Sequence, residues 1–301
     1  MVTFKDALAK GTEILKDAGN EAPAVDARAL LCHAAGCGRA YIYTHGEQAL
    51  ESGVWERYVT YLGKRAAGMP VQYITGQCEF LSLDFEVGPD VLVPRPDTEV
   101  LVETAARLLT AKGAPCEILD IGTGSGCIAI GIAHLIKSCV VTAVDVSEEA
   151  LLTARKNAVK NGISDRLEFI KSDLFGSLDG RRFDAVLSNP PYIRSGDIPG
   201  LQREVRDYEP RAALDGGPDG LVFYRRIVEE APSHLKECGL LAFEVGQGQA
   251  CEVAALMERH YIDIEVLKDL AGIERVVAGK LDSRAGCCIQ SPNVQPAERH
   301  H

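Results

Sequence analysis

The apolar positions of the first 68 residues recur every three or four residues, which predicts amphipathic helices rather than strands. A first helix is expected after Thr3, which can cap its N-terminus, and it should end at Gly19. Two further helices are expected near residues 24–35 and 52–67. The apolar residues that share helical faces are Phe4, Ala7, Leu8, Ile14, Leu15, Val54, Tyr58, Tyr61 and Leu62. Residues 1–68 thus predict a small helical bundle, either a scaffold or lid or a module that docks a partner protein.

From residue 117 onward, short apolar runs alternate with amphipathic stretches. Short continuous apolar runs are typical of strands buried on both faces, and the amphipathic stretches between them of crossover helices. The expected strands cover residues 118–121, 140–145, 167–170, 183–188, 240–244, 262–267 and 275–278. The expected helices cover residues 127–136, 221–235 and 250–260, with another that opens at 147–149. This alternation predicts the α/β fold class, with a doubly wound, seven-stranded and mostly parallel sheet.

A β-hairpin is expected between the two regions, because residues 69–76 and 79–87 alternate partially and are punctuated by glycine and proline. Prolines then flank Arg95 in an extended turn, and Asp97 or Thr98 is expected to cap the next helix. Arg95 is either a plain surface residue or a cation that steadies a loop or an acidic group. The predicted organisation is a helical domain over 1–68, a hairpin linker over 69–94, an α/β domain over 95–281 and a polar tail over 282–301.

Composition narrows the class of protein. The net charge of −11 counts against a broad phosphate-binding face. The ten cysteines form no C-x-x-C pair and are expected to be reduced thiols. The chain starts without a secretion signal and has no apolar run of the ~18 residues that cross a bilayer, so we expect a cytoplasmic protein without membrane contact. No metal site is expected, because the cysteines lack the usual zinc spacing and the terminal His300-His301 pair, which is either native or the remnant of a tag, is not taken as a ligand pair.

The candidate catalytic residues follow the expected strand at 183–188 and read Asn189-Pro190-Pro191-Tyr192. The prolines end the strand because they cannot donate to a ladder. The side-chain oxygen of Asn189 and a proline carbonyl can together accept both hydrogens of a planar NH2 group, and Tyr192 offers a flat wall for stacking. This arrangement suits a reaction at a weakly nucleophilic nitrogen. Taken alone, the tetrapeptide is also compatible with a capped turn.

A glycine-rich turn after the strand at 118–121 predicts the cofactor site, and it consists of Gly122, Thr123, Gly124, Ser125 and Gly126. Asp145 ends the next strand, where a carboxylate can accept hydrogen bonds from both hydroxyls of a ribose. The turn lacks the G-x-G-x-x-G spacing of nicotinamide enzymes, and Asp120 before it would repel a pyrophosphate but attract a cation. S-adenosylmethionine carries an ammonium and a sulfonium, so it is the expected cofactor. Asp173 and Leu174, after the third strand, are placed to meet its adenine.

With these features in place, the chain resembles the class I S-adenosylmethionine-dependent methyltransferases, and N-P-P-Y resembles those that methylate planar nitrogens. The flanking segments narrow this to the HemK-type peptide chain release factor glutamine methyltransferases, and the resemblance covers residues 1 to about 280. The segments that carry it are P-V-Q-Y-I-T-G at 70–76, V-P-R-P-D-T-E at 93–99, E-P-R-A-A-L at 209–214, G-G-P-D-G-L at 216–221 and E-V-G-Q-G-Q at 244–249.

The resemblance implies direct methyl transfer from S-adenosylmethionine to the amide nitrogen N5 of the glutamine in the Gly-Gly-Gln loop of class I peptide chain release factors. It implies that Asn189, Pro190, Pro191 and Tyr192 bind this amide, with Asn189, Pro190 and Tyr192 catalytic. Residues 1–68 would hold the release factor, and we expect a monomer without direct contact to nucleic acid. The implied cofactor-binding residues are Asp120, Gly122, Thr123, Gly124, Ser125, Gly126, Asp145, Asp173, Leu174 and Asn189.

Three alternatives stay open. A ribosomal-protein glutamine N5-methyltransferase would share the cofactor motifs, although the segments at 94–99 and 209–214 favour the release factor. A DNA or RNA adenine N6-methyltransferase would share N-P-P-Y, but the charge of −11 and the lack of a separate target-recognition domain count against it. An inactive cofactor-binding scaffold is disfavoured by the intact N-P-P-Y.

Overall fold

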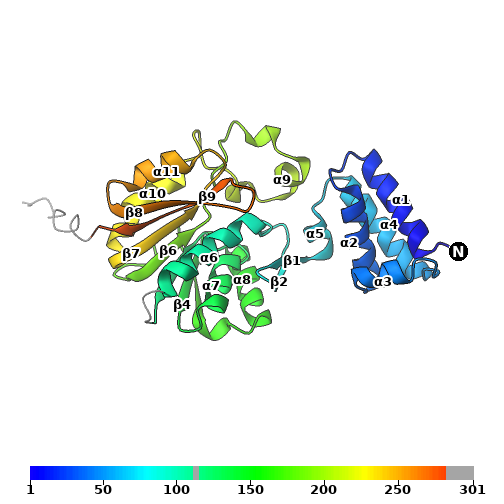
Figure 1. Cartoon of the computed structure of the whole chain (residues 1–301), viewed down its shortest axis with the longest axis horizontal. Coiled ribbons are helices and arrows are strands. Elements are labelled where there is room, and N and C mark those ends of the chain that lie inside the picture. The colour runs from blue at the N-terminus through cyan, green and yellow to red at the C-terminus, as the bar shows by residue number, and fades with distance from the viewer. Residues whose placement is uncertain (111–114, 283–301) are drawn as a thin grey trace, which may run out of the picture.

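The computed structural model describes residues 1–110 and 115–282, so the expected polar tail over 282–301 lies, apart from Asp282, outside the described residues. A helical region at the N-terminus and a larger α/β region lie side by side and are joined by a short hairpin (Figure 1). Within the described residues, no helix combines the length and the apolar character needed to cross a bilayer.

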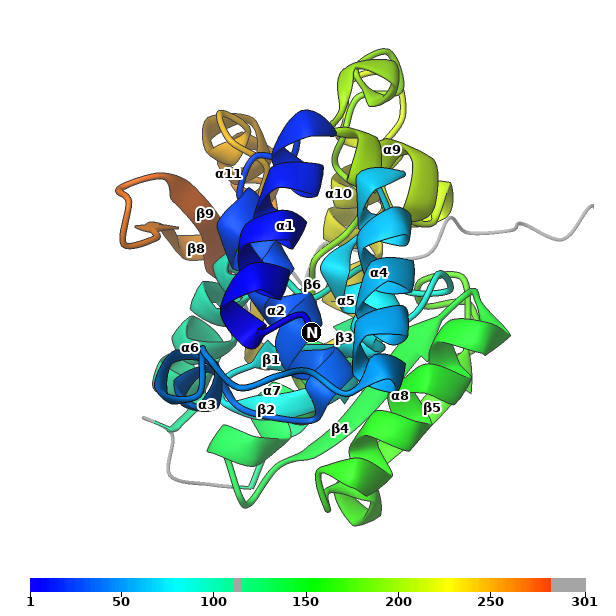
Figure 2. The same cartoon turned by 90° about the vertical axis from the view of Figure 1, so that its right-hand side faces the viewer.

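The helical region is a bundle whose longer helices pack side by side (Figure 2). Its helices are α1 (Phe4–Asp17), α2 (Pro23–Ala35), α3 (Arg39–Thr44), α4 (Ser52–Ala66) and α5 (Val71–Thr75). Thr3 caps α1 through a capping box, because its hydroxyl accepts from the Asp6 backbone and the Asp6 carboxylate accepts from the Thr3 backbone. Leu15, Leu31 and Tyr58 are fully buried in the core of the bundle. The two short helices α3 and α5 were not predicted.

The expected hairpin over 69–94 is wrong in part. The strands are β1 (Gln77–Phe80) and β2 (Leu83–Glu86), which pair antiparallel, whereas residues before them form α5. Helix α5 follows Pro70 and ends at Gly76, whose φ of 72° belongs to the left-handed region that favours glycine. Ile74 packs into the core of the bundle, and Phe80 packs into the core of the α/β region. The boundary between the two cores therefore falls close to Gly76 rather than at residue 68.

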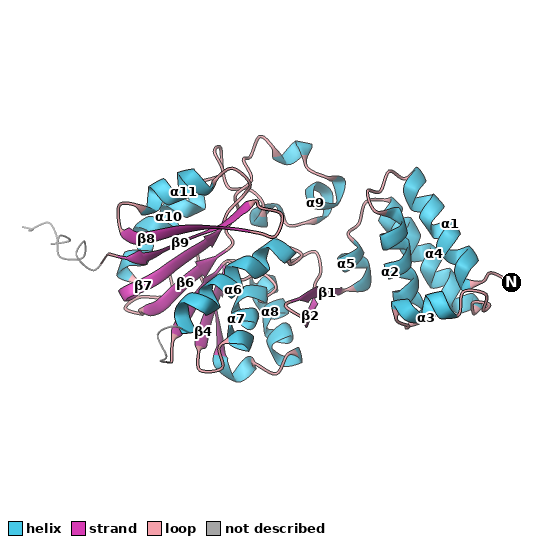
Figure 3. Cartoon of the chain, in the orientation of Figure 1, coloured by secondary structure: helices cyan, strands magenta, loops and turns pink. Residues whose placement is uncertain are grey.

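The α/β region is built on a seven-stranded sheet in the order β5-β4-β3-β6-β7-β9-β8, which confirms the predicted fold class (Figure 3). Strand β9 runs opposite to its neighbours, and the other pairs among β3 to β7 are parallel. The strands are β3 (Glu117–Ile121), β4 (Val140–Asp145), β5 (Leu167–Lys171), β6 (Phe183–Ser188), β7 (Leu235–Glu244), β8 (Tyr261–Lys268) and β9 (Glu274–Leu281).

Helices cover both faces of the sheet, with α6, α7 and α8 on one face and α10 and α11 on the other (Figure 1). Their bounds are α6 (Pro96–Thr110), α7 (Cys127–Leu135), α8 (Glu148–Lys160), α10 (Val222–Glu230) and α11 (Ala250–Met257). Successive strand residues alternate between the two cores, so Ile118 packs on one side and Leu119 on the other. Two expectations were wrong. The helix expected over 221–235 is α10, which ends at Glu230, and the strand expected to begin at residue 240 is β7, which begins at Leu235. Helix α6 begins at Pro96, so Asp97 and Thr98 lie in its first turn instead of capping it.

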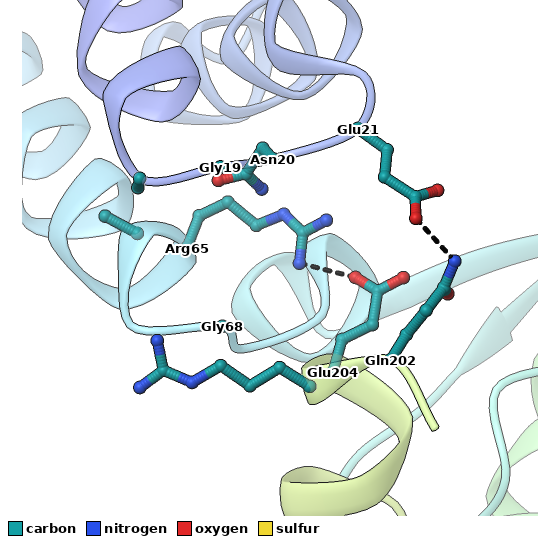
Figure 4. Close-up of a pocket in the computed structure, with 10 residues that line it drawn as sticks. Gly19, Asn20, Glu21, Arg65, Gly68, Gln202 and Glu204 are labelled. Carbon is teal, nitrogen blue, oxygen red and sulfur yellow. Dashed lines mark hydrogen bonds and ion pairs between the residues drawn. The ribbon is translucent and has the colours of Figure 1, made fainter. Parts of the chain in front are cut away.

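A loop of the α/β region reaches back to the helical bundle and carries the short helix α9 (Arg203–Tyr208). Figure 4 shows Arg65 of α4 paired with Glu204 of α9, and Gln202 bonded to Glu21. Arg65 also pairs with Asp26 inside the bundle at 2.7 Å and has a side chain only 11% exposed. The Tyr208 hydroxyl donates to the carbonyl of Ala67 at 3.1 Å. The bundle is thus held to the α/β region at α9 as well as through the hairpin.

Candidate active site

The candidate site lies at the carboxyl ends of β3, β4 and β6. Strand β4 flanks β3 on one side and β6 flanks it on the other, so the chain order reverses between β3 and β6. In open α/β sheets, ligands bind at such a switch point, beyond the carboxyl ends of the strands. Asp120 near the end of β3, Asp145 at the end of β4 and Asn189 directly after β6 are thereby brought to one edge of the sheet.

The glycine-rich turn between β3 and α7 presents its backbone without obstruction. Gly122, Gly124 and Gly126 have φ angles of 72°, 54° and 84°, which favour glycine. A Cβ atom added at Gly122 or Gly124 would meet nothing within 4 Å, so the outer side of the turn is open to a ligand. Thr123 and Ser125 are instead buried, at 4% and 2% exposure, and the Thr123 hydroxyl is already committed to Asp120.

Asp120 is fully buried behind this turn. Its Oδ2 accepts from the Thr123 hydroxyl at 2.6 Å and from the Ala129 backbone at 3.2 Å, while Oδ1 has no partner among the described residues. Burial raises the pKa of Asp120 to about 7 against the effect of these hydrogen bonds. A cation held at the turn would favour the ionised form of Asp120. The carboxyl group of Asp120 therefore fits a ligand that carries an ammonium or a sulfonium, and it disfavours a pyrophosphate.

Asp145 supports the turn directly. Its Oδ2 accepts from the Gly124 backbone at 2.9 Å, and its Oδ1 accepts from the Ser147 backbone at 2.9 Å. Each carboxylate oxygen can accept more than one hydrogen bond, so both oxygens keep acceptor capacity for ribose hydroxyls. Sequence reasoning placed Asp145 at the site but did not anticipate that it also holds the glycine turn in shape.

The segment expected to meet adenine has a partner that sequence reasoning missed. The Asp173 carboxylate pairs with Arg226 of α10 at 3.0 Å, and its side chain is 62% exposed. Leu174 is buried and has a φ of 49°, which is uncommon for a residue with a side chain. The Ser172 hydroxyl donates to the carbonyl of Leu174 at 2.9 Å and so fixes this bend beyond β5.

Asn189 is held by its amide nitrogen. Its Nδ2 donates to the Thr98 hydroxyl of α6 at 3.3 Å, and no described residue donates to its Oδ1. Just before it, the Ser188 hydroxyl donates to the carbonyl of Ile121 at 2.8 Å and ties the end of β6 to the end of β3. Among the described residues, no donor contacts the side-chain oxygen of Asn189, which remains available as an acceptor.

The rest of N-P-P-Y packs against residues 214–220, whose role the sequence did not reveal. The Ile193 backbone donates to Leu214 at 3.0 Å and accepts from Gly216 at 2.8 Å. A Cβ at Gly216 would lie 2.7 Å from the carbonyl oxygen of Pro191 and 2.8 Å from the Cα of Tyr192, so only glycine fits there. Burial raises the pKa of Tyr192 to about 12, which keeps this phenol neutral and rules it out as a base near neutral pH.

Arg95 and Gln249 tie neighbouring segments to the site. The Arg95 guanidinium pairs with Glu209, whose side chain is only 1% exposed, so the P-R-P-D and E-P-R-A segments meet. Of the two roles considered for Arg95, the structure supports steadying a loop. The Gln249 side chain donates to the Tyr192 carbonyl at 3.1 Å and accepts from the Gly246 backbone at 3.0 Å. The contacts of Arg95 with Glu209 and of Gln249 with Tyr192 join residues 114 and 57 positions apart, so local sequence patterns carry no signal for them.

Comparison with known proteins gives consistent matches over most of the chain. Residues 6–76 match the family described as PrmC N-terminal domain, and residues 96–201 match the family described as Methyltransferase small domain. The release factor glutamine methyltransferase of Clostridium acetobutylicum is 40% identical over 277 residues, which are 91% of this chain and 97% of that protein. The protein of the same name from Moorella thermoacetica is 42% identical over 279 residues, again 91% and 97%.

A solved structure gives a further match. It is described as a protein-(glutamine-N5) methyltransferase (release factor-specific) from Alicyclobacillus acidocaldarius, and it is 38% identical to this chain. The aligned part covers 66% of this chain and 99% of that chain, with a TM-score of 0.41.

Proposed function

Because the chain belongs to the family of release factor glutamine methyltransferases, we propose that it methylates the glutamine of the Gly-Gly-Gln loop in class I peptide chain release factors. The methyl group would pass from S-adenosylmethionine to the side-chain amide nitrogen N5. The observation that carries this proposal is Asn189, whose Nδ2 is occupied by Thr98 while its Oδ1 is free to accept from a substrate NH2 group. A protein of this family with that acceptor at the switch point of its sheet is suited to activating an amide nitrogen.

The proposed cofactor supplies, when bound, a methyl group on a positively charged sulfur. The open backbone of Gly122 and Gly124 and the spare acceptor capacity of Asp145 would hold it, and the charge of Asp120 behind the turn favours its cations. We propose that Asp173 and Leu174 border its adenine, with the Asp173 carboxylate fixed by Arg226.

Toward the substrate, Asn189 Oδ1 and the Pro190 carbonyl would accept the two hydrogens of the glutamine amide. An amide nitrogen is a poor nucleophile because its lone pair is delocalised into the carbonyl. Two acceptors stabilise the positive charge that develops on the NH2 group, and they act most strongly where water is excluded. Burial keeps the Tyr192 phenol neutral, so it would offer the amide a flat wall, and the departing proton is assigned to water rather than to this residue.

We further propose that the helical bundle docks the release factor. A groove of about 680 Å³ runs between α2, the hairpin and the start of α6, and its lining includes His33, Gln72, Glu79, Pro94 and Pro96. This groove lies between the bundle and the start of the α/β region, where a bound protein would contact both. We propose that the enzyme acts as a monomer without direct contact to nucleic acid, in keeping with its charge of −11.

The test is to offer methyl-labelled S-adenosylmethionine with purified release factor, ribosomal protein or nucleic acid. Label is expected on the release factor, at the glutamine of the Gly-Gly-Gln loop, and a factor with glutamate at that position is the matched control. Label on ribosomal protein or nucleic acid, with none on the release factor, would refute the proposed function and identify the substrate class.

Replacing Asp145 with alanine is expected to weaken cofactor binding by about 1.5–3 kcal/mol, the usual range for hydrogen bonds to a charged group. The variant loses the acceptor for the ribose and also the bond to the Gly124 backbone. Calorimetric titration with S-adenosylmethionine measures the effect, and thermal melting checks the fold. An unchanged affinity would assign Asp145 a purely structural role.

Replacing Gly216 with alanine is expected to slow methyl transfer by about 10–100-fold, because the added Cβ would push the backbone of Pro191 and Tyr192 out of place. Cofactor affinity should stay within about twofold, since the glycine turn is untouched. Gly63→Ala in α4 is the matched control, because a Cβ there meets nothing within 4 Å. Full activity of Gly216→Ala would show that the position of N-P-P-Y tolerates this displacement.

A further inference from the structure

Behind Asn189 lies a buried carboxylate that the proposed chemistry does not use. Glu244 ends β7, and the register pairs its neighbour Phe243 with Ser188, so Glu244 and Asn189 occupy adjacent strand ends. Glu244 is 1% exposed, and its Oε2 has no partner among the described residues. Thr98, which is 2% exposed, reaches the same place from the first turn of α6.

The three side chains lie close together. Asn189 Nδ2 donates to the Thr98 hydroxyl at 3.3 Å, and Thr98 and Asn189 both act to lower the pKa of the adjacent Glu244 carboxylate. The NH2 group of Asn189 is therefore committed to the side where Thr98 and Glu244 lie. Its Oδ1 must then face the opposite side, because the two ends of a planar amide point apart.

The charge on Glu244 decides between the two orientations of this amide. If the amide turned over, Oδ1 would face the carboxylate, and two acceptors would meet in a buried place without a hydrogen between them. We propose that Glu244, together with Thr98, is a positioning residue that fixes the Asn189 amide so that its oxygen faces the substrate amide. This inference rests on the proposed function, because it assigns the reaction a residue that does not touch the substrate.

The surroundings of Glu244 make this device sensitive to pH. Burial and the nearby Asp97 raise the pKa of Glu244 to about 7, against the opposing effects of Thr98, Arg275 and Asn189. A protonated carboxyl can donate, so it no longer disfavours the turned-over amide, and methyl transfer should fall as the pH drops through about 7. The charged and titratable groups that face Glu244 from the elements packed around it are Asp97 of α6, Arg275 of β9, Tyr192 after β6, Tyr224 of α10 and Cys127 of α7.

The experiment compares the full-length wild type with Glu244→Gln in single turnovers across neutral pH, with saturating S-adenosylmethionine and release factor. The glutamine variant is expected to transfer methyl about 10-fold or more slowly above pH 7, as when other supporting partners of a reacting group are lost. It should also lose the part of the pH dependence that belongs to Glu244. Cofactor affinity and the KM for release factor should change by less than about twofold. Glu244→Asp, which keeps a carboxylate, should recover part of the rate and of the pH dependence.

Asp120 titrates in the same range, so it needs its own control. The ionisation of Asp120 is expected to change cofactor binding, and this pH dependence should persist in Glu244→Gln. The pH dependence of methyl transfer that Glu244 contributes should be absent from that variant. If Glu244→Gln fails to fold, Thr98→Val decides, because it removes the hydroxyl with little change in shape and should also slow transfer. A folded variant with the wild-type rate and wild-type pH profile would overturn the proposal.

A measurement without turnover separates this inference from the proposed function. The side-chain NH2 of Asn189, assigned in ¹⁵N spectra by its loss in Asn189→Asp, should shift with pH near 7 in the wild type but not in Glu244→Gln. An Asn189 signal that is indifferent to pH in both proteins would overturn the positioning role whatever the substrate proves to be. A wild type that shows the shift but does not label release factor would refute the proposed function and leave the positioning role standing.

Discussion

Asn189→Ala is expected to slow methyl transfer to the release factor by about 10²–10³-fold, or roughly 2.7–4 kcal/mol, the range for losing one preorganised hydrogen-bond partner. The variant removes the Oδ1 acceptor and leaves Pro190 and Pro191 to set the backbone. The glycine turn and Asp145 remain in place, so cofactor affinity should barely change. Single-turnover transfer with saturating cofactor is the measurement.

Asn189→Asp tests the geometry separately. It keeps an acceptor where Oδ1 lies but replaces the NH2 group that donates to Thr98, and it brings a second carboxyl toward Glu244. We expect activity between that of the alanine variant and that of the wild type. Parental rates in Asn189→Ala would mean that the substrate amide is not held by this side chain, and the proposed mechanism would then have to be abandoned.

Removing residues 1–75 is expected to abolish methylation of intact release factor while leaving cofactor binding largely unchanged. The cut falls before β1 because Ile74 belongs to the core of the bundle, whereas Phe80 and Phe85 belong to the core of the α/β region. The proposed cofactor-binding residues, between Asp120 and Asn189, all lie after the cut, so only docking should be lost. The measurements are methyl incorporation into release factor and calorimetric titration with S-adenosylmethionine.

A short peptide that contains the Gly-Gly-Gln sequence is the control for this truncation. Such a peptide does not reach the bundle, so the truncated and full-length enzymes should methylate it at similar, low rates. If the truncated enzyme modified intact release factor at full efficiency, the docking role of the bundle would be wrong. Loss of cofactor binding as well would instead show that the α/β region needs the bundle to fold.

The sequence predicted the sheet well because a parallel strand buried on both faces is a short apolar run with little ambiguity once helices flank it. The position of Asn189 was equally clear, since prolines must end β6 directly after it. Helix α5 was missed because five residues with three β-branched members and a tyrosine fit a strand as well as a helix turn. The packing of Ile74 into the core of the bundle favours the helix, and this contact cannot be predicted from a local sequence pattern.

What surrounds the candidate residues could not be predicted in the same way. Thr98 stands 91 positions from Asn189, and Arg95 stands 114 positions from Glu209. Their hydrogen bonds depend on how α6 and the loop after β6 pack, which periodicity does not describe. Asp173 illustrates the same limit, because its pairing with Arg226 needs the α10 helix to lie beside the end of β5.

The double pairing of Arg65 has a consequence for exchanging parts between relatives. Its guanidinium contacts Asp26 within the bundle and Glu204 on α9, while Glu21 contacts Gln202. A bundle transferred alone to a relative would keep Arg65 and Glu21 but would lose their partners Glu204 and Gln202, because the relative supplies its own α9. Residues 1–76 and 202–208 therefore form one unit of exchange, although more than a hundred residues of the cofactor-binding region separate them along the chain.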